Sequence, residues 1–273
     1  SSPLAMCRAA TPRNTAARVL GMSRHTASYV ALSAVFAASF LVLNGPYGYV
    51  IAFESRTNDC FFLFGRPFLL EFLDHPAGPL RYAARFLGQF YHHQWIGALI
   101  VSACITAFGF LLRGILKKRQ TTVPVAQILL PCLLLIGLHT STLYHLQDTL
   151  GLCTSCAAFL GYLALPGRRS RFLLAVAAIP ALYFLAGAHV WLLAVWLVLY
   201  QWADGGARSR RMLSLILVAY SIIIPLIVWR WLYLIPLRSA FLYPFVLGPP
   251  VRTVWSEQTS AQLTIDAALA IAL

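Results

Sequence analysis

The chain has 273 residues, of which 60% are hydrophobic and only 11% charged, and its mean hydropathy is +0.74. A water-soluble domain carries about 25% charged residues, because its surface must be wetted. The composition therefore excludes an ordinary soluble protein and indicates an integral membrane protein. Its apolar runs are long and unbroken, which favours helices over the alternating pattern of membrane strands.

The net charge is +13, from 21 Lys and Arg against 8 Asp and Glu. In a soluble protein such an excess would suggest nucleic-acid binding. In a membrane protein it is typical of basic loops retained in the cytoplasm. The basic residues here cluster between apolar runs, so we expect membrane lipid as a partner and no nucleic acid.

Apolar segments follow one another along most of the chain. Those long enough for a span cover residues 27–44, 95–116, 123–139, 146–165, 171–187, 188–203 and 212–236, and a tight turn near Gly187 joins the fifth to the sixth. Residues 261–273 are apolar but too short to span, at about 1.5 Å per residue. They predict an incomplete eighth helix in a truncated chain. The predicted fold class is all-α, a polytopic helical membrane protein with about seven transmembrane helices.

Basic residues assign the two sides of the membrane. Residues 1–26 form a basic N-terminal segment, within which Met22 fits a natural start. Further basic clusters separate spans two and three, four and five, and six and seven, namely Arg113, Lys117, Lys118 and Arg119; Arg168, Arg169 and Arg171; and Arg208, Arg210 and Arg211. All four segments fall on one side, which the positive-inside rule assigns to the cytoplasm. Residues 27–236 form the transmembrane domain, and residues 237–273 begin outside.

A large first loop, residues 45–94, lies on the outer side and holds half of the acidic residues: Glu54, Asp59, Glu71 and Asp74. Residues 60–73 are too apolar for an open loop, and Gly-Arg-Pro interrupts them, so we expect them to lie in the membrane interface or to dip into the membrane. Residues 80–95 predict an amphipathic helix lying flat at the headgroups. It serves either as simple anchoring or as a platform that holds a lipid-linked substrate by its phosphate, through Arg81 and Arg85.

Several motifs in this loop and beyond it resemble an uncharacterised, domain-of-unknown-function family of bacterial multi-pass inner-membrane proteins. The motifs are Glu54, the turn Pro76-Ala77-Gly78-Pro79-Leu80, Gln89-Phe90-Tyr91, Trp95-Ile96-Gly97-Ala98, Tyr144-His145-Leu146 with Gly151-Leu152, and Tyr183-Phe184-Leu185-Ala186-Gly187. The turn departs from the family's pattern, because Ala77 replaces a glycine and Pro79 is inserted. The resemblance covers residues 41–200 and implies an inner-membrane location but no established activity.

The architecture is also similar to membrane glycosyltransferases that use polyprenyl-phosphate sugars. That similarity implies an enzyme acting on lipid-linked sugars at the outer face. Its chemistry requires a carboxylate near the first span, as a base or as a ligand for a divalent metal, and Glu54 and then Asp59 are the candidates. Cations would hold the lipid phosphate. The expected substrate-binding residues are Arg56, Arg81, Arg85, His139, His145 and His189.

Three other functions remain open. One is a non-catalytic membrane scaffold or assembly subunit of an envelope system. The second is a thiol oxidoreductase built on Cys153 and Cys156, although the second outer cysteine pair that such enzymes use is reduced here to Cys60. The third is a transporter, which the near absence of charges within the spans disfavours.

Overall fold

Every regular element in the described part of the chain is helical. The computed structural model describes residues 24–57, 62–119, 123–142, 144–203, 208–231 and 241, and contains no strand within them. The all-α fold class is confirmed for this part. Most of the predicted N-terminal segment and the incomplete eighth helix lie outside the described residues.

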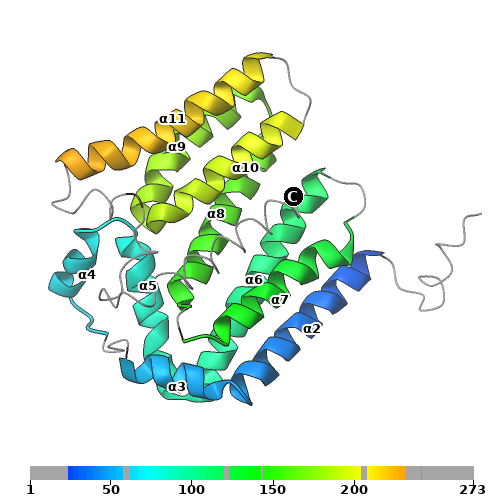
Figure 1. Cartoon of the computed structure of the whole chain (residues 1–273), viewed down its shortest axis with the longest axis vertical. Coiled ribbons are helices and arrows are strands. Elements are labelled where there is room, and N and C mark those ends of the chain that lie inside the picture. Colours follow the sequence, from blue (N-terminus) through cyan, green and yellow to red (C-terminus); the bar gives the residue numbers. More distant parts are fainter. Residues whose placement is uncertain are drawn as a thin grey trace, which may run out of the picture.

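Figure 1 shows how the helices are arranged. In chain order they are α2 (Arg24–Asn44), α3 (Gly48–Thr57), α4 (Arg66–Leu73), α5 (Gly78–Gly88), the 3-10 turn η2 (Gln89–His92), α6 (Gln94–Arg119), α7 (Val125–His139), α8 (Leu146–Ala164), α9 (Arg168–Ala186), the 3-10 turn η3 (Gly187–His189), α10 (Val190–Ala203) and α11 (Arg208–Trp231).

The first loop is folded into short helices. α4 begins directly after the extended residue Gly65, with Pro67 in its first turn, where a backbone N–H has no partner within the helix. The Gly-Arg-Pro sequence is therefore a helix start. Pro79 has the same place in α5. The amphipathic helix expected over residues 80–95 ends at Gly88, passes into η2, and gives way to α6 before Trp95.

Helices α2 and α6 pack side by side in opposite directions. Arg113, near the end of α6, donates a hydrogen bond from Nε to Ser28 Oγ at 2.9 Å. Its guanidinium also lies over the ring of Tyr29, 4.2 Å from the centroid. Both partners are near the start of α2. Arg113, which belongs to a basic cluster in the sequence, therefore joins α2 to α6 at a partly buried position.

Helices α6 and α8 run in the same direction. Cys153 Sγ is 3.7 Å from the carbonyl oxygen of Cys104. Further along both helices, Gly114 faces Leu160, so closely that an added Cβ would lie 3.1 Å from Leu160 Cδ2. In the chain, α7 connects α6 to α8. Because the loops on either side of α7 are short, α7 runs antiparallel to both helices, and α6 and α8 are therefore parallel to each other.

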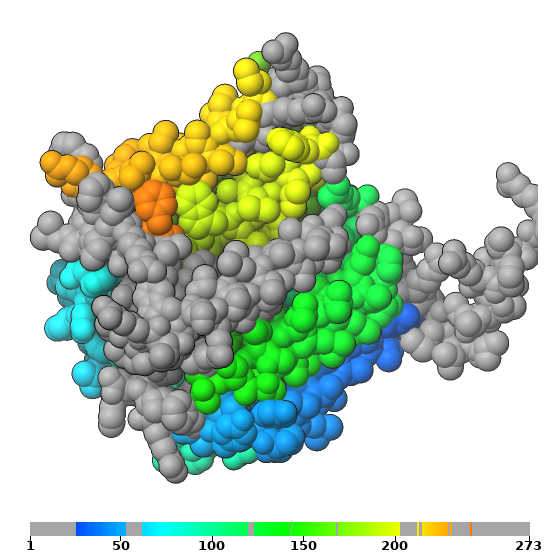
Figure 2. Space-filling view, in the orientation of Figure 1, coloured from blue at the N-terminus to red at the C-terminus, as the bar shows by residue number. Residues whose placement is uncertain are grey.

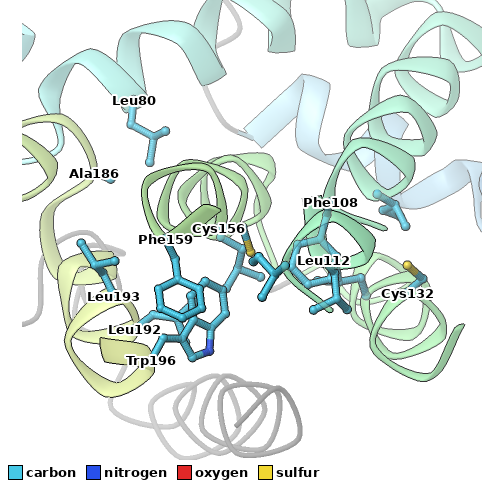
Figure 3. Packing of buried hydrophobic residues seen from close by; sticks show 14 of the residues in the cluster. Leu80, Phe108, Leu112, Cys132, Cys156, Phe159, Ala186, Leu192, Leu193 and Trp196 are labelled. Atoms are coloured by element: carbon cyan, nitrogen blue, oxygen red, sulfur yellow. The ribbon is translucent and has the colours of Figure 1, made fainter. Parts of the chain in front are cut away.

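Helix α10 runs parallel to α8. Ser155 Oγ donates to the carbonyl oxygen of His189 at 2.9 Å. Further along, the rings of Phe159 and Trp196 have centroids 5.4 Å apart. Figure 3 shows these two rings next to each other in the core.

Among the described residues, three helical stretches are long and apolar enough to cross a membrane: Thr26–Asn44, Gln94–Arg119 and Arg169–Trp202. The third comprises α9, η3 and α10 and folds back on itself. Arg171, near its start, donates to the hydroxyl of Tyr200, near its end, at 3.3 Å. Gly187 takes φ 62° at the bend, which a glycine adopts without strain. The structure thus places a turn at the predicted position.

The bundle has two different ends. The described residues of the first loop, 45–57 and 62–93, lie at one end, here called the first-loop end. At the opposite end α2 begins, α6 ends, and α9 and α11 begin, so the basic clusters gather there (Figure 1). We call it the basic end.

Apolar side chains cover much of the outward surface. α7 exposes Leu130, Leu133 and Leu134, and α11 exposes Leu215, Ile216, Ile222, Ile223, Leu226 and Ile227. Figure 2 shows both helices at the surface. Soluble proteins rarely expose such continuous apolar surface. The apolar helices suggest a membrane protein, as the composition predicts.

Replacing Gly151 with alanine is expected to destabilise the bundle. The new Cβ would lie 2.3 Å from His189 Cε1, so the buried histidine would have to move. Gly161 is a matched control on the same helix, because nothing lies within 4 Å of its added Cβ. In detergent, Gly151→Ala should lower the free energy of unfolding by about 1–3 kcal/mol. Gly161→Ala should leave it unchanged or raise it by up to about 1 kcal/mol. Equal effects would contradict the packing of His189 on α8.

Candidate functional site

A tight turn fixes the first loop to the bundle. Ala77 is fully buried and has φ 58°, the one positive φ of a non-glycine residue in the described part. Its N–H donates to the carbonyl oxygen of Phe184 at the end of α9, at 3.1 Å. At Gly78 an added Cβ would lie 2.0 Å from the carbonyl oxygen of Phe72, so only glycine fits. Figure 3 shows Leu80 of α5 pointing toward Ala186. The turn thereby joins α4 to α5, and α5 packs against α8 and α9.

Aromatic rings fill the space between α4 and α5. Phe62 contacts Tyr82 and Phe86 edge to face, with centroids 4.8 and 5.3 Å apart. We call the connected group the aromatic platform; its members are Phe62, Phe64, Phe68, Phe72, Tyr82, Phe86 and Phe90. Phe64 is 80% exposed and the neighbouring Leu63 is 64% exposed. The platform therefore presents apolar surface outward.

Arg81 and Arg85 share one aromatic ring. Their guanidinium carbons lie 5.7 and 5.4 Å from the centroid of Phe72, within the range of a cation–π interaction. Partial burial and the neighbouring charge of Arg85 lower the pKa of Arg81, while Glu71 acts in the opposite direction. Two cations held this close repel each other, and a bound anion would relieve that repulsion.

A buried polar network joins α7 to α8. His139 Nε2 lies 2.8 Å from Thr149 Oγ1, and that hydroxyl donates to the hydroxyl of Tyr144 at 3.3 Å. Because Thr149 has one hydrogen to donate, the consistent assignment has His139 donating through Nε2. The rings of His139 and Tyr144 also meet edge to face, with centroids 4.9 Å apart. These contacts hold the two helix ends together.

His189 joins the α9–α10 turn to α8. It is 1% exposed, and its Nδ1 lies 2.9 Å from the carbonyl oxygen of Ala186, which can only accept. Its own carbonyl accepts from Ser155, and its ring lies against Gly151. His189 is therefore a packing residue of the bundle as well as a candidate ligand.

His145 caps the start of α8. It forms a reciprocal capping box with Asp148, in which the His145 N–H donates to Asp148 Oδ2 at 3.4 Å. Capping of this kind satisfies N–H groups that otherwise lack partners at a helix start. Asp148 is buried, and His145 is partly exposed. Of the three candidate histidines, His145 is the most accessible.

The structure groups the candidate residues in part. Arg81 and Arg85 lie together on α5, and the three histidines surround the first turns of α8, against which α5 packs. Glu54 and Arg56 lie on α3, which packs against α6 and η2, but their side chains are not among those described. Asp59 lies outside the described residues.

The sequence motifs did not single out Phe72 or Thr149 as residues of a functional site. No local pattern marks Phe72, because its contact with the arginines depends on the turn between α4 and α5. Thr149 lies one position after Asp148 in a capping-box pattern, which would have drawn attention to the start of α8.

The described residues contain no group of three or more His, Cys, Asp and Glu side chains arranged to hold a metal. The divalent metal therefore remains a prediction. The cysteines of α6, α7 and α8 are free thiols within packed helices, and Cys132 and Cys156 are fully buried. Cys60, the outer cysteine that the thiol oxidoreductase hypothesis would use as a second thiol, lies outside the described residues.

The model of a protein family of unknown function matches residues 23–273. This match extends beyond the 41–200 region that carries the resemblance seen in the sequence. No curated protein and no solved structure matches the chain. The chain therefore belongs to the family of unknown function DUF6057.

Proposed function

We propose that the first-loop end binds the phosphate of a lipid-linked sugar, and that the protein is a glycosyltransferase-like membrane enzyme acting on it. The observation that carries the proposal is the pair Arg81 and Arg85 on the ring of Phe72. A phosphate accepts paired hydrogen bonds from a guanidinium, and its charge offsets the repulsion between the two cations.

The aromatic platform supports a lipid as the carrier of that phosphate. Its exposed members, with Leu63, offer apolar surface beside the two arginines. Aromatic side chains concentrate at the boundary between headgroups and hydrocarbon, where a polyprenyl chain enters the membrane. A soluble sugar phosphate would gain nothing from this surface.

The proposed reaction transfers the sugar to an acceptor hydroxyl. Glu54, or Asp59 in its place, takes the hydroxyl proton while the oxygen forms a bond to the anomeric carbon. The bond between that carbon and the phosphate oxygen breaks, and the electron pair leaves with the lipid phosphate. Arg81 and Arg85 stabilise the charge that develops there, with Arg56 as a further ligand. A divalent metal at the carboxylates is compatible with this chemistry.

The three histidines take different parts in this proposal. His145, partly exposed at the start of α8, contacts the sugar or the acceptor. His139 and His189 are buried and support the site by fixing the ends of α7, α8 and α10. The histidines of the short α7–α8 and α9–α10 turns would thus complete the site at the first-loop end of the bundle.

The proposed topology has about seven spans in a bacterial inner membrane, with the N-terminus in the cytoplasm and the first loop outside. The gathering of the basic clusters at one end of the bundle supports it, because those loops would share the cytoplasmic side.

A non-catalytic scaffold of an envelope system is the second candidate. The same exposed platform would serve to anchor the first loop in the membrane without any reaction. The two functions differ in their need for the carboxylates of the first loop.

Replacing both arginines, Arg81→Gln with Arg85→Gln, is expected to weaken binding of a polyprenyl monophosphate by at least about tenfold, since two charge-assisted contacts are lost. Binding is measured with the purified full chain in lipid nanodiscs. The control is Lys117→Gln with Lys118→Gln, which removes the same charge at the exposed basic end. Equal weakening in both double variants would show that only net charge matters, and the proposed site would be wrong.

Replacing the carboxylates tests the enzyme against the scaffold. Glu54→Gln with Asp59→Asn should retain polyprenyl monophosphate binding but change the lipid-linked sugar or glycan profile of the native host, because the base is lost. Glu71→Gln with Asp74→Asn, also in the first loop, is the control. An unchanged profile in the first pair, with the protein present at normal abundance, would reject the enzyme and favour the scaffold.

A further inference from the structure

Arg113 lies where α6 meets α2, and α2 is at the edge of the bundle (Figure 1). It precedes Arg119, the last residue of α6, by six residues, about 9 Å along the helix axis, and it is partly exposed. It belongs to the apolar stretch Gln94–Arg119. A cation within such a stretch is costly unless it reaches water or a partner, and residues of this kind commonly have a function.

The partners of Arg113 among the described residues are neutral. Nε donates to Ser28 Oγ at 2.9 Å, and Nη1 donates to the hydroxyl of Tyr29 at 3.2 Å. The guanidinium carbon also lies 4.2 Å from the centroid of the Tyr29 ring, a cation–π contact. These two hydrogen bonds use two of the five N–H groups that a guanidinium carries. Within the described part of the chain, Nη2 therefore has donors to offer to a ligand.

No carboxylate whose position the structure describes offsets this charge. The described acidic side chains are Glu71 and Asp74 of the first loop and Asp148 in the first turn of α8, and all three lie toward the first-loop end. Arg113 points instead into a contact that supplies only hydroxyl groups and an aromatic ring. The ligand that complements it carries negative charge.

The surface beside the guanidinium is aromatic and outward-facing. Tyr29 is 48% exposed and Phe110 is 46% exposed, and their ring centroids lie 6.1 Å apart. Phe110 precedes Arg113 by three residues, so it lies on a neighbouring part of the same face of α6, closer to the middle of the stretch. An amphipathic ligand would therefore place its charge on Arg113 and its hydrocarbon along the two rings.

We propose that Arg113, Tyr29 and Phe110, here called the α2–α6 site, bind one anionic membrane phospholipid. Its phosphate accepts hydrogen bonds from the guanidinium, and one acyl chain lies along the two rings toward the middle of the membrane. The site is on the outside of the bundle, so a complete lipid fits without an internal cavity. Free phosphate would satisfy the cation but would leave the aromatic surface uncovered. The proposal is independent of the reaction proposed for the first-loop end.

The test is native mass spectrometry of the detergent-purified full chain, titrated with phosphatidylglycerol or with phosphatidylcholine. We expect one phosphatidylglycerol to bind in preference to phosphatidylcholine, and Arg113→Gln to weaken that binding about tenfold, because charge-assisted hydrogen bonds are lost. Lys118→Gln is the charge-matched control and should leave the affinity unchanged. Lys118 is exposed at the same end of α6 but lies five residues further, about 140° around the helix.

A second control separates lipid binding from the contact between the helices. Ser28→Ala with Tyr29→Phe removes both hydrogen-bond acceptors of Arg113 but keeps the cation and the aromatic ring. This variant should bind phosphatidylglycerol within about threefold of the unmodified chain. Phe110→Ala leaves the hydrogen bonds of Arg113 intact and should weaken binding about threefold, because apolar contact with the acyl chain is lost. It tests the site even where Arg113→Gln fails to fold, which thermal unfolding in detergent would show.

Several outcomes would overturn the proposal. Equal losses in Arg113→Gln and Lys118→Gln would reveal binding by surface charge alone, and equal affinity for the two lipids would exclude an anion site. A loss in the Ser28 and Tyr29 variant as large as that in Arg113→Gln would show that Arg113 only joins the helices. Displacement of the lipid by millimolar inorganic phosphate would identify a free-phosphate site instead. The same titration in the Arg81→Gln and Arg85→Gln variant should still show one bound phosphatidylglycerol, so this site and the first-loop site can fail independently.

Discussion

The arrangement of the bundle depends on the contact between His189 and the first turns of α8. The imidazole lies against Gly151, and its backbone carbonyl accepts from Ser155. In a membrane each buried polar group needs a partner within the protein, because lipid supplies none. This contact provides partners at the α9–α10 turn and sets α10 parallel to α8. α5 then packs against α8 and α9, so the first loop takes its position from the same centre.

The two ends of the bundle consequently differ in chemistry. The first-loop end combines the paired arginines on Phe72 with an exposed aromatic platform. The basic end gathers the basic clusters at the end of α6 and at the starts of α9 and α11. Under the proposed function, the first-loop end binds a molecule that carries a phosphate and a hydrocarbon chain.

Much of the fold could be predicted from the sequence, because long apolar runs in lipid satisfy their backbone only as helices. The turn near Gly187 could also be predicted, because it divides an apolar run that is long enough for two helices. The Gly-Arg-Pro sequence interrupts the apolar run as predicted, and the structure adds that it also starts a helix, α4. The candidate site was predictable only as a list of residue types. Sharing of Phe72 by two arginines, and burial of His139 and His189, arise from contacts between distant segments, which no local spacing reveals.

The central claim, that the first-loop end and the basic end face opposite sides of a membrane, is tested most directly by site-specific labelling in intact cells. Cysteine is introduced by Arg66→Cys or by Lys118→Cys, both at exposed positions, in a chain whose six native cysteines are replaced. A membrane-impermeant maleimide should label Arg66→Cys from outside, and Lys118→Cys only after the membrane is permeabilised. Labelling of both positions from the same side, or the reverse order, would contradict the account.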